Sequence, residues 1–506
     1  MDLRLVTPAL VVWATTLLGL LGPAWSMPWL AMLSVIAGAA LSFACWRRHD
    51  GWGAINWRSV GVVVVGAGMA ATCAAALWLR LETRAAHPLF GLSGKTTVSM
   101  TIRDDPRNFG PAARGQVSIR VAVDVVGGKR VRAGVADLVG RSAHWAGILP
   151  GQRVIALVSV RAPRGGDLSV ARLAAVGSPR LLGRPPPIQR AAGAVRERLQ
   201  QSAARALHGE SAGLLPGLVI GDESTLSTQV RAEFVASGLS HLTAVSGANF
   251  ALICGAAVAL VRVLGASPRV AAACGAVVIV AFVVLVRPSP SVLRAAMMGG
   301  VGLLALISAR QARALPALGI AVVGGLLWWP ELALAPGFAL SVAATAGLVV
   351  MAPRLRDWLR EKRVPSGLAE VLAIAIAAQI VTAPLIALIS GTFNVVSVLA
   401  NVLVAPVVAI ISVVGTVAAI VGAFGPPGGV GVLLAELLLR ALRPELWWML
   451  TCAHHLGGPG WAAIAVPSGV PGLLLVVGMT TLIALIALRW RNVGAPLRAV
   501  LTRIRR

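Results

Sequence analysis

The chain has 506 residues, of which 57% are hydrophobic and only 13% are charged, whereas soluble domains carry about 25% charged residues. This composition excludes a water-soluble globular protein and indicates an integral membrane protein. The formal net charge of +26 comes mostly from arginine and suits anionic lipid headgroups, the positive-inside rule or a polyanionic substrate, without choosing among them.

The N-terminal part contains three apolar segments, near residues 7–25, 29–46 and 60–79. Each is close to the 20 or so residues that a helix needs to cross the hydrocarbon layer of a membrane. Because more apolar segments follow, we interpret the first as a retained helix rather than a cleaved signal peptide. Residues 1–80 are therefore predicted to be a domain of transmembrane helices.

Residues 81–185 do not resemble a membrane segment. The stretch QVSIRVAVDVV (116–126) alternates apolar and polar side chains, which is typical of a half-buried strand. Further strands are predicted in TTVSMTIRDDP, KRVRAGV and GQRVIALVSVRAP, separated by Gly, Pro and Asp turns. Several short strands indicate a small all-β barrel, and an OB-like fold is one candidate.

This outer segment is also basic. Between Arg80 and Glu210, 21 Lys and Arg residues stand against 8 Asp and Glu residues. Such a charge either binds nucleic acid or another anionic polymer, or belongs to a domain that is simply well solvated. Charge alone leaves both interpretations open.

Residues 186–236 are predicted to be a helical connector. GRPPPIQR (183–190) is a stiff Pro-rich entry, after which apolar residues from Ile188 to Ala203 recur at helical spacing with arginines between them. This pattern predicts an interfacial amphipathic helix that directs Arg190, Arg196, Arg198 and Arg205 toward headgroups. GLLPGLVIG (213–221) is too short to span a membrane, so we expect it to enter partway or to pack on other helices.

Nine more apolar segments follow, which brings the total to about twelve and predicts a polytopic α-helical membrane protein. Arginines recur in every second loop, so by the positive-inside rule both termini are cytoplasmic and residues 80–240 lie outside. We delimit a transmembrane domain at 237–490 and a basic cytoplasmic tail at 491–506. The nine segments lie near 241–265, 269–286, 291–309, 314–330, 332–352, 367–389, 394–423, 428–450 and 471–489.

The stretch GLSHLTAVSGANF (238–250) places polar residues where a membrane helix is expected to begin. On an ideal helix Thr243, Ser246 and Asn249 form one polar face with Gly247, while His241 points away. Small and polar residues serve either close helix packing or the wall of a polar conduit. Taken alone, the stretch favours packing.

Polar residues and prolines also interrupt apolar segments further along the chain. RPSPSVLRAA (287–296) puts Arg294 near the start of a span, and LAPGFALS (334–341) puts Pro336 and Gly337 inside another. Gln379 precedes Pro384, and Asn401 precedes Pro406. Discontinuous helices with polar residues mark translocation pathways, although each site alone could be a packing kink and Arg294 could snorkel outward.

Enzyme signatures are sparse. The sequence has no GxSxG, HExxH or Walker-type loop, and the adjacent Ser240 and His241 diverge on a helix, which argues against a triad. The five cysteines lie in apolar segments without CxxC spacing, so we expect neither disulfides nor a metal site. We predict no enzymatic activity, no cofactor and no metal.

Taken together, these motifs resemble the ComEC-type competence proteins, the inner-membrane channels for DNA uptake. GLSHLTAVSGANFAL, preceded by LLPGLVIGDESTLSTQVRAEFVASG, is similar to the core motif of that family. SPSVLRAAMMG, LAPGFALSVAATAGL and ANVLVAPVV look like later motifs in the expected order, and the N-terminal spans with a basic β-domain resemble its amino-terminal module. The resemblance extends from about residue 25 to 490.

The resemblance implies a channel in the bacterial cell (inner) membrane that carries single-stranded DNA inward during natural transformation. Double- or single-stranded DNA and membrane lipids are the expected partners, together with a separate DNA receptor, nuclease and cytoplasmic motor. The implied channel residues are Asp222, Ser240, His241, Thr243, Ser246, Gly247, Asn249, Arg294, Pro336, Gly337, Ser341, Gln379 and Asn401. The implied DNA-binding residues of the OB-like domain are Arg103, Arg107, Arg120, Lys129, Arg130, Arg132, Arg153, Arg161 and Arg164.

Two departures from the family pattern affect these expectations. A common version of the motif reads Leu-His after VSG, whereas this chain has Ala248 and Asn249. Many relatives continue into a metallo-β-lactamase-like domain with an HxHxDH cluster, which this sequence lacks. Two rival interpretations stay open: a transporter or flippase for another polyanion, and a membrane-embedded hydrolase that uses Ser240 or Ser246.

Overall fold

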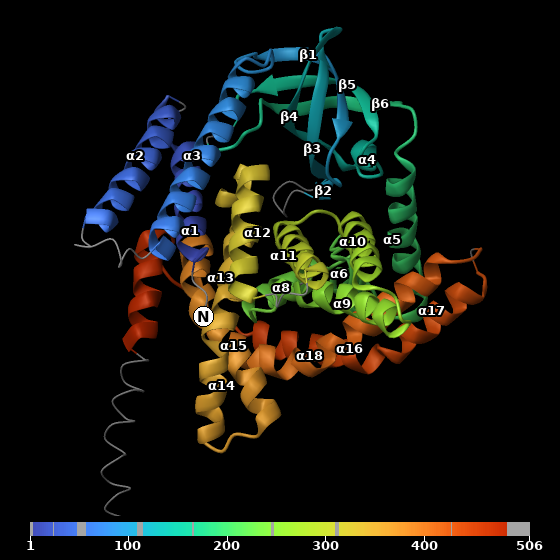
Figure 1. The fold of residues 1–506 in the computed structure, drawn as a ribbon. Helices are drawn as coiled ribbons and strands as arrows, with labels where there is room; N and C mark the ends of the chain where they lie inside the picture. Colours follow the sequence, from blue (N-terminus) through green and yellow to red (C-terminus); the bar gives the residue numbers. More distant parts are fainter. Residues whose placement is uncertain are drawn as a thin grey trace, which may run out of the picture. The chain divides into compact units, whose positions relative to one another are not determined.

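The computed structural model describes residues 4–23, 25–47, 57–108, 115–163, 166–243, 247–308, 313–426 and 428–482 (Figure 1). The chain divides into two compact units. Unit 1 comprises Met1–Ser227, His241–Phe338 and Val407–Trp447, and unit 2 comprises Thr228–Ser240, Ala339–Pro406 and Trp448–Arg506.

The N-terminal helices α1 (Val6–Leu21), α2 (Ser26–Arg47) and α3 (Trp57–Ala85) occupy the three predicted segments. Both α1 and α2 pack on α3. The packing is close because residue 19 is a glycine, and a Cβ atom there would lie 2.5 Å from side-chain atoms of Leu77 and Met27. The first helix is thus an integral part of the packed unit.

The β-domain of unit 1 is a six-stranded sheet in the order β1-β5-β6-β4-β3-β2. An additional pairing between β1 and β3 closes it into a barrel-like form, visible at the top of Figure 1. All pairings are antiparallel except that of β4 with β6. The strands are β1 (Gly94–Ile102), β2 (Arg107–Asn108), β3 (Gln116–Val126), β4 (Lys129–Arg141), β5 (Arg153–Arg161) and β6 (Arg172–Leu182).

The alternation of apolar and polar side chains explains why these segments form strands. In β3 the apolar residues Val117, Ile119 and Val121 are buried, while Ser118 and Arg120 between them are only half-buried. The short helix α4 (Ser142–Trp145) adds Trp145, whose ring leaves no space for a side chain at Gly140. The four predicted strand segments are confirmed, whereas β2 and the parallel strand β6 were not predicted.

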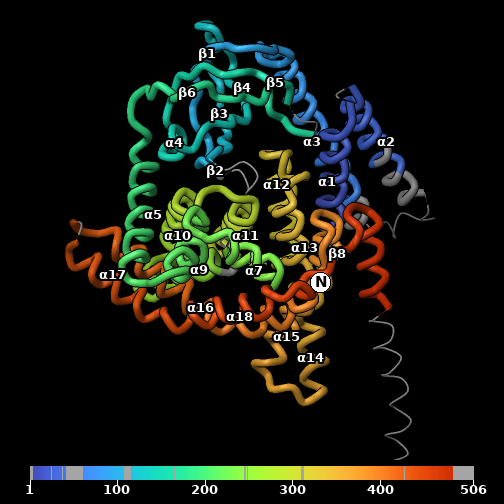
Figure 2. The backbone as a smooth tube through the Cα atoms, turned by 180° about the vertical axis from the view of Figure 1, so that it is seen from behind, coloured from blue at the N-terminus to red at the C-terminus, as the bar shows by residue number. Residues whose placement is uncertain are grey.

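Helix α5 (Pro187–Ala206) leads away from β6 as one continuous helix, which is clear in Figure 2. It packs on α6, α10 and α17. The remaining elements of unit 1 are α6 (Glu210–Ile220), α8 (Ser240–Thr243), α9 (Gly247–Val263), α10 (Pro268–Val286), α11 (Pro290–Ile307), α12 (Ala314–Trp328), η2 (Pro330–Leu334) and α17 (Val430–Ala441).

Unit 2 is built around two long apolar helices, α15 (Ser366–Ser390) and α16 (Ser397–Ala423), the second of which continues into unit 1. Two short strands, β7 (Thr392–Asn394) and β8 (Ala463–Ala465), pair antiparallel. Strand β7 packs against α15. The other elements are α7 (Thr228–Ala236), α13 (Pro336–Val350), α14 (Ala352–Glu361) and α18 (Arg443–Gly457). Helices α13 and α18 begin in unit 1 and continue into unit 2.

Among the described residues, five helices are long and apolar enough to cross a membrane: Gly61–Ala85, Pro268–Val286, Pro290–Ile307, Ser366–Ser390 and Ser397–Ala423. A sixth candidate is α13 with α14, which are bent by 43°. The protein is therefore mostly helical, with several candidate spans and a small barrel-like sheet.

Some predicted segments have a different form. The segment predicted over 428–450 divides into α17 and α18, separated at Leu442. Pro336 and Gly337 were expected inside a span, but Pro336 is the first residue of α13. Proline is favoured at this position because its missing N–H would have no partner in the first turn. Helices α15 and α16 run through Pro384 and Pro406 without a break in the helix assignment.

Candidate functional site

The turn after α6 is a polar centre of unit 1. Gly221 ends the helix in the left-handed conformation, with φ of 68°. The carboxylate of Asp222 then accepts hydrogen bonds from Arg196 and Gln200, both at 2.9 Å, and from the Ser224 backbone N–H at 3.1 Å. Asp222, a predicted channel residue, is thus held on three sides by its own unit.

Arg196 connects this turn to the β-domain. Its guanidinium binds Asp222 at 2.9 Å and lies 3.9 Å from Asp105, in the loop between β1 and β2. Asp105 also pairs with Arg287 at 2.6 Å, and Arg287 donates a further bond to Gln189 of α5. All four charged side chains of this network are at most 25% exposed, so the ion pairs are partly shielded from solvent and from salt.

A second contact joins the same turn to the start of the polar stretch. The Thr243 hydroxyl donates to the Glu223 carboxylate at 2.5 Å. Gly217 of α6 faces Thr243 as well, because a Cβ atom on it would lie 3.7 Å from the Thr243 carbonyl oxygen. The structure therefore brings Asp222 and Thr243 together through Glu223, a residue that the sequence prediction missed.

Arg294 lies against the beginning of α9. A Cβ atom on Gly247 would be 2.8 Å from the Arg294 guanidinium, and the arginine is only 7% exposed. It contacts the Met298 sulfur at 3.2 Å, and its neighbour Ala295 belongs to an apolar cluster with Phe250. The idea that Arg294 snorkels outward is wrong, because the side chain is buried.

The other predicted residues of this stretch vary in exposure. Ser240 and His241 are exposed, Thr243 is buried, and Asn249 is half-buried at the start of α9. Ser246 lies outside the described residues. Pro336 and Gly337 are exposed at the start of α13, and Ser341 is half-buried in that helix.

In unit 2, polar side chains form hydrogen bonds at the C-terminal end of α7. The Asn394 amide donates to the Val235 and Ala236 carbonyls, both at 2.8 Å, and so caps the helix. Gln379 donates to the Asn394 carbonyl at 3.1 Å. Gly238, with φ of 75°, sits so close to Ser397 that a Cβ atom would be 2.5 Å from its hydroxyl.

Two further side chains of unit 2 have local partners. The Asn401 amide donates to the Ser397 carbonyl one turn earlier, at 2.8 Å. Glu233 of α7 pairs with His454 of α18, a contact that the sequence did not indicate. Gln379 and Asn401 thus have structural hydrogen bonds, and their predicted channel role stays a prediction.

The predicted DNA-binding residues of the β-domain fall into two groups by strand register. Lys129 and Arg130 lie at the β3–β4 turn, which packs beside the start of β1, and Arg161 ends β5 at the same end of the barrel. These three are exposed, as is Arg132. Arg103, Arg107, Arg120 and Arg153 lie toward the opposite end, while Arg164 is outside the described residues.

At that opposite end acidic side chains face the arginines. Arg153 pairs with Asp124 at 2.6 Å, and Arg120 lies 3.7 Å from Asp137 and 3.9 Å from Glu331. Burial, together with the neighbouring Asp167, raises the pKa of the Asp137 carboxyl. The two ends therefore differ: Lys129, Arg130 and Arg161 present positive charge to solvent, whereas Arg120 and Arg153 are partly neutralised.

Arginine side chains also satisfy carbonyl groups at helix C-termini, a role that sequence reasoning missed. The last carbonyls of a helix have no partner in it and carry partial negative charge, so a guanidinium there is favourable. Such contacts join Arg196 to Ile220 and Leu285, Arg198 to Ala423, Arg80 to Trp328, and Arg443 to Ala206, at 2.6–3.3 Å.

These contacts give three arginines of α5 partners within the protein. Arg196 and Arg198 bind other helices, and Arg205 pairs with Glu436 of α17 at 3.6 Å, while the interfacial position of α5 stays a prediction. Arg196 and Leu285 are 89 residues apart in the chain. Because nothing in the local pattern marks such a pair, one sequence offers no signal for it.

Within the described residues, no group of three or more His, Cys, Asp or Glu side chains is arranged to hold a metal ion.

Comparison with known proteins adds independent findings. The sequence model of the family described as "Competence protein" matches residues 218–492. The chain is also similar to ComE operon protein 3 of Bacillus subtilis (strain 168), with 25% identity over 189 residues. That similarity covers 37% of this chain and 24% of the relative, so the chain matches about a quarter of the relative's length. No solved structure matches.

Proposed function

Because this chain belongs to the Competence protein family, we propose that it carries single-stranded DNA across the bacterial cell membrane into the cytoplasm during natural transformation. The observation that best supports this function is Arg294, a cation held 7% exposed beside Gly247 in a bundle of apolar helices. Charged residues inside membrane helices are costly, face the bundle interior or a water-filled cavity, and mark substrate pathways. A guanidinium there suits the phosphates of a passing strand.

The proposal includes a membrane arrangement. About twelve helices cross the cell membrane, both termini are cytoplasmic, and the β-domain is external with an OB-like fold. The five candidate spans and the closed small sheet support this arrangement. The domain limits follow the sequence: 1–80 membrane helices, 81–185 β-domain, 186–236 connector, 237–490 channel domain and 491–506 basic tail.

The external domain is proposed to engage DNA through the exposed group at one end of the barrel, Lys129, Arg130 and Arg161. Because Arg153 already has an acidic partner, we expect it to contribute less. Phosphate contacts of this kind are independent of base sequence and weaken steeply as salt rises. They would concentrate DNA at the outer surface without selecting it.

We propose that the chain contributes a passage rather than catalysis. The predicted channel residues around Asp222, Thr243, Gly247 and Arg294 belong to this passage in unit 1. A receptor, a nuclease and a cytoplasmic motor would then be separate partners, and the transported strand would be the substrate.

The test separates DNA capture from DNA arrival. A deletion strain should bind labelled DNA at its surface nearly as well as wild type but yield no transformants. Complementation with Arg294→Gln should give wild-type membrane abundance and leave capture unchanged, but transformation should stay reduced. Arg354→Gln, which alters an exposed helix-capping arginine, should restore transformation. Normal transformation in the deletion strain would overturn the proposal.

A second candidate is a transporter or flippase for another polyanion, because guanidinium groups recognise phosphate or carboxylate without reading bases. Purified full-length protein can be offered labelled single-stranded DNA in competition with polyphosphate or an anionic polysaccharide. Displacement of DNA at equal charge concentration would favour the second candidate, and selective retention of DNA favours the first.

A further inference from the structure

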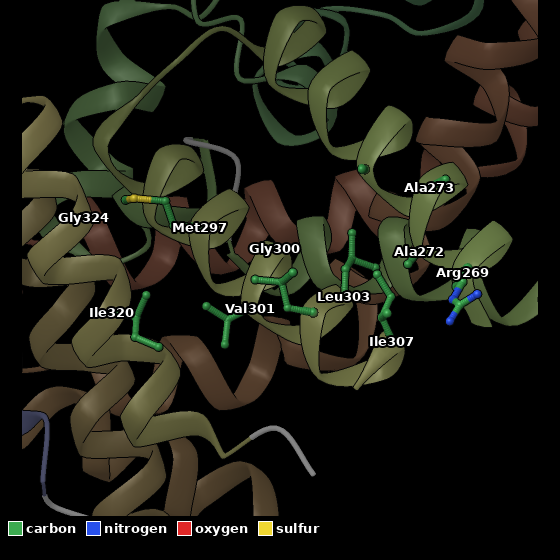
Figure 3. Close-up of a pocket in the computed structure, with 12 residues that line it drawn as sticks. Arg269, Ala272, Ala273, Met297, Gly300, Val301, Leu303, Ile307, Ile320 and Gly324 are labelled. Carbon is green, nitrogen blue, oxygen red and sulfur yellow. The ribbon is translucent and has the colours of Figure 1, made fainter. Parts of the chain in front are cut away.

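An apolar groove runs along one face of unit 1, between α10, α11 and α12 (Figure 3). Its volume is ≈ 590 Å³, and aliphatic or small side chains line it except at one end. Figure 3 shows Arg269 at that end, with Met297 and Gly324 toward the other. Volumes of this size are typical of small-molecule sites.

The groove exists because small residues leave it open. A Cβ atom on Gly300 would meet no other atom within 4 Å, so this part of the α11 surface is unfilled. By contrast, Gly275 of α10 is packed directly against Leu303. The two helices therefore touch at Gly275 and separate at Gly300, and the groove follows the separation.

The charge at the end of the groove is in an unusual place. Arg269 is exposed in the first turn of α10, where the helix dipole disfavours a cation. It therefore does not stabilise its own helix by charge. Gly275 contacts Leu303 and Ile279 contacts Gly299, so α10 and α11 run antiparallel. The first turn of α10, with Arg269, is therefore at the same end as the last turn of α11, with Ile307.

We propose that the groove binds an acyl chain of an anionic phospholipid, whose phosphate contacts Arg269. Both α10 and α11 are long and apolar enough to cross a membrane, and basic residues at the ends of such helices attract anionic headgroups. The lining carries no aromatic side chain on which a base could stack, so the groove does not suit single-stranded DNA. The inference depends on the membrane placement of these helices and not on DNA transport.

The experiment is native mass spectrometry of the full chain, purified from nanodiscs that hold dioleoyl phosphatidylglycerol and dioleoyl phosphatidylcholine in equal amounts. The two lipids share their chains and differ in net charge. We expect the wild-type protein to retain phosphatidylglycerol about fivefold over phosphatidylcholine, which corresponds to roughly 1 kcal/mol for one basic residue at the surface. Arg269→Gln should bring the ratio close to one.

Blocking the groove is the second arm. Gly300→Leu should reduce retention of both lipids, because its side chain enters the open space. Gly302→Leu is the matched control, since this glycine lies on the same helix, also has open space around it, and does not line the groove. Arg262→Gln is the control for charge, because Arg262 is outside the lining and caps its own turn at Ala266.

Equal retention of the two lipids by the wild-type protein would overturn the proposal. So would an unchanged preference in Arg269→Gln, or unchanged retention of both lipids in a folded Gly300→Leu variant. If Gly300→Leu instead converted a dimer into a monomer without altering lipid retention, the occupant would be a second copy of the chain. Because Arg269 is exposed and its replacement leaves the packing intact, that variant keeps the test decisive should Gly300→Leu fail to fold.

Discussion

Gly247 and Arg294 are packed so closely that a Cβ atom on residue 247 would lie 2.8 Å from the Arg294 guanidinium. The glycine therefore sets the position of a buried cation at the start of α9. This relationship joins two residues that are 47 positions apart in the chain, one in the motif GLSHLTAVSGANF and one in the motif RPSPSVLRAA. If Arg294 contacts the transported strand, its position depends on the lack of a side chain at Gly247.

Replacing Gly247 with alanine should displace Arg294 and reduce transformation by roughly tenfold or more, equivalent to about 1.4 kcal/mol. Gly255→Ala is the matched control, because Gly255 lies on the same helix and a Cβ atom there would meet open space. Transformation frequency is measured together with membrane abundance by immunoblot. Equal frequencies in the two variants would contradict a role for this packing in transport.

The Arg196–Asp222 pair should contribute to the stability of unit 1. Asp222→Ala leaves Arg196 and Gln200 without their shared acceptor, and we expect a loss of about 1–3 kcal/mol in the free energy of unfolding. The thermal midpoint of the detergent-solubilised protein reports it. Asp357→Ala serves as the control, since the exposed Arg356–Asp357 pair should contribute almost nothing; a comparable fall there would contradict the assignment.

The two groups of basic residues in the β-domain should differ in DNA binding. The combined Lys129→Ala, Arg130→Ala and Arg161→Ala variant should lose affinity for single-stranded DNA, with the salt slope smaller by roughly 0.7 for each lost phosphate contact. Arg153→Ala should change the salt slope of binding little, because the Arg153 guanidinium already pairs with Asp124. Fluorescence anisotropy on the full chain between low and physiological salt measures both, and identical slopes in all proteins would refute this surface.

His87, just after α3, gives a pH dependence with a defined sign. The imidazole is 5% exposed, its Nδ1 accepts the Leu89 backbone N–H at 3.2 Å, and burial lowers the pKa of the ring. The unfolded chain therefore binds a proton more readily than the folded one. The stability that neutral His87 contributes is present above the unfolded pKa of about 6.5 and is lost as the pH falls toward the lowered value.

Thermal midpoints from pH 8 to pH 5 check this sign. His87→Gln should show a smaller decrease on acidification than the wild-type protein. The control is His144→Gln, which alters an exposed histidine of the same domain and should follow the wild-type curve. A parallel decrease in all three proteins would assign the pH dependence to other groups.

The sequence alone determined those features that depend on local periodicity and composition. A low charged fraction and long apolar segments predicted membrane helices, and the alternation in residues 116–126 predicted β3 to the residue, because a half-buried strand repeats every two positions. The motifs of residues 214–252 pointed to the family. Local turn chemistry likewise explains Pro336 at the start of α13, although the sequence interpretation placed it inside a span.

The tertiary structure decided which polar side chains meet. Asp222 and Arg287 belong to distant segments, yet Arg196 and Asp105 connect them in one charge network, and the arginines of α5 bind the carbonyl ends of other helices. Gln379 and Asn401 have the same sequence character as Thr243, but their partners are backbone carbonyls of unit 2. Such pairings depend on packing between residues far apart in the chain, and no local pattern encodes them.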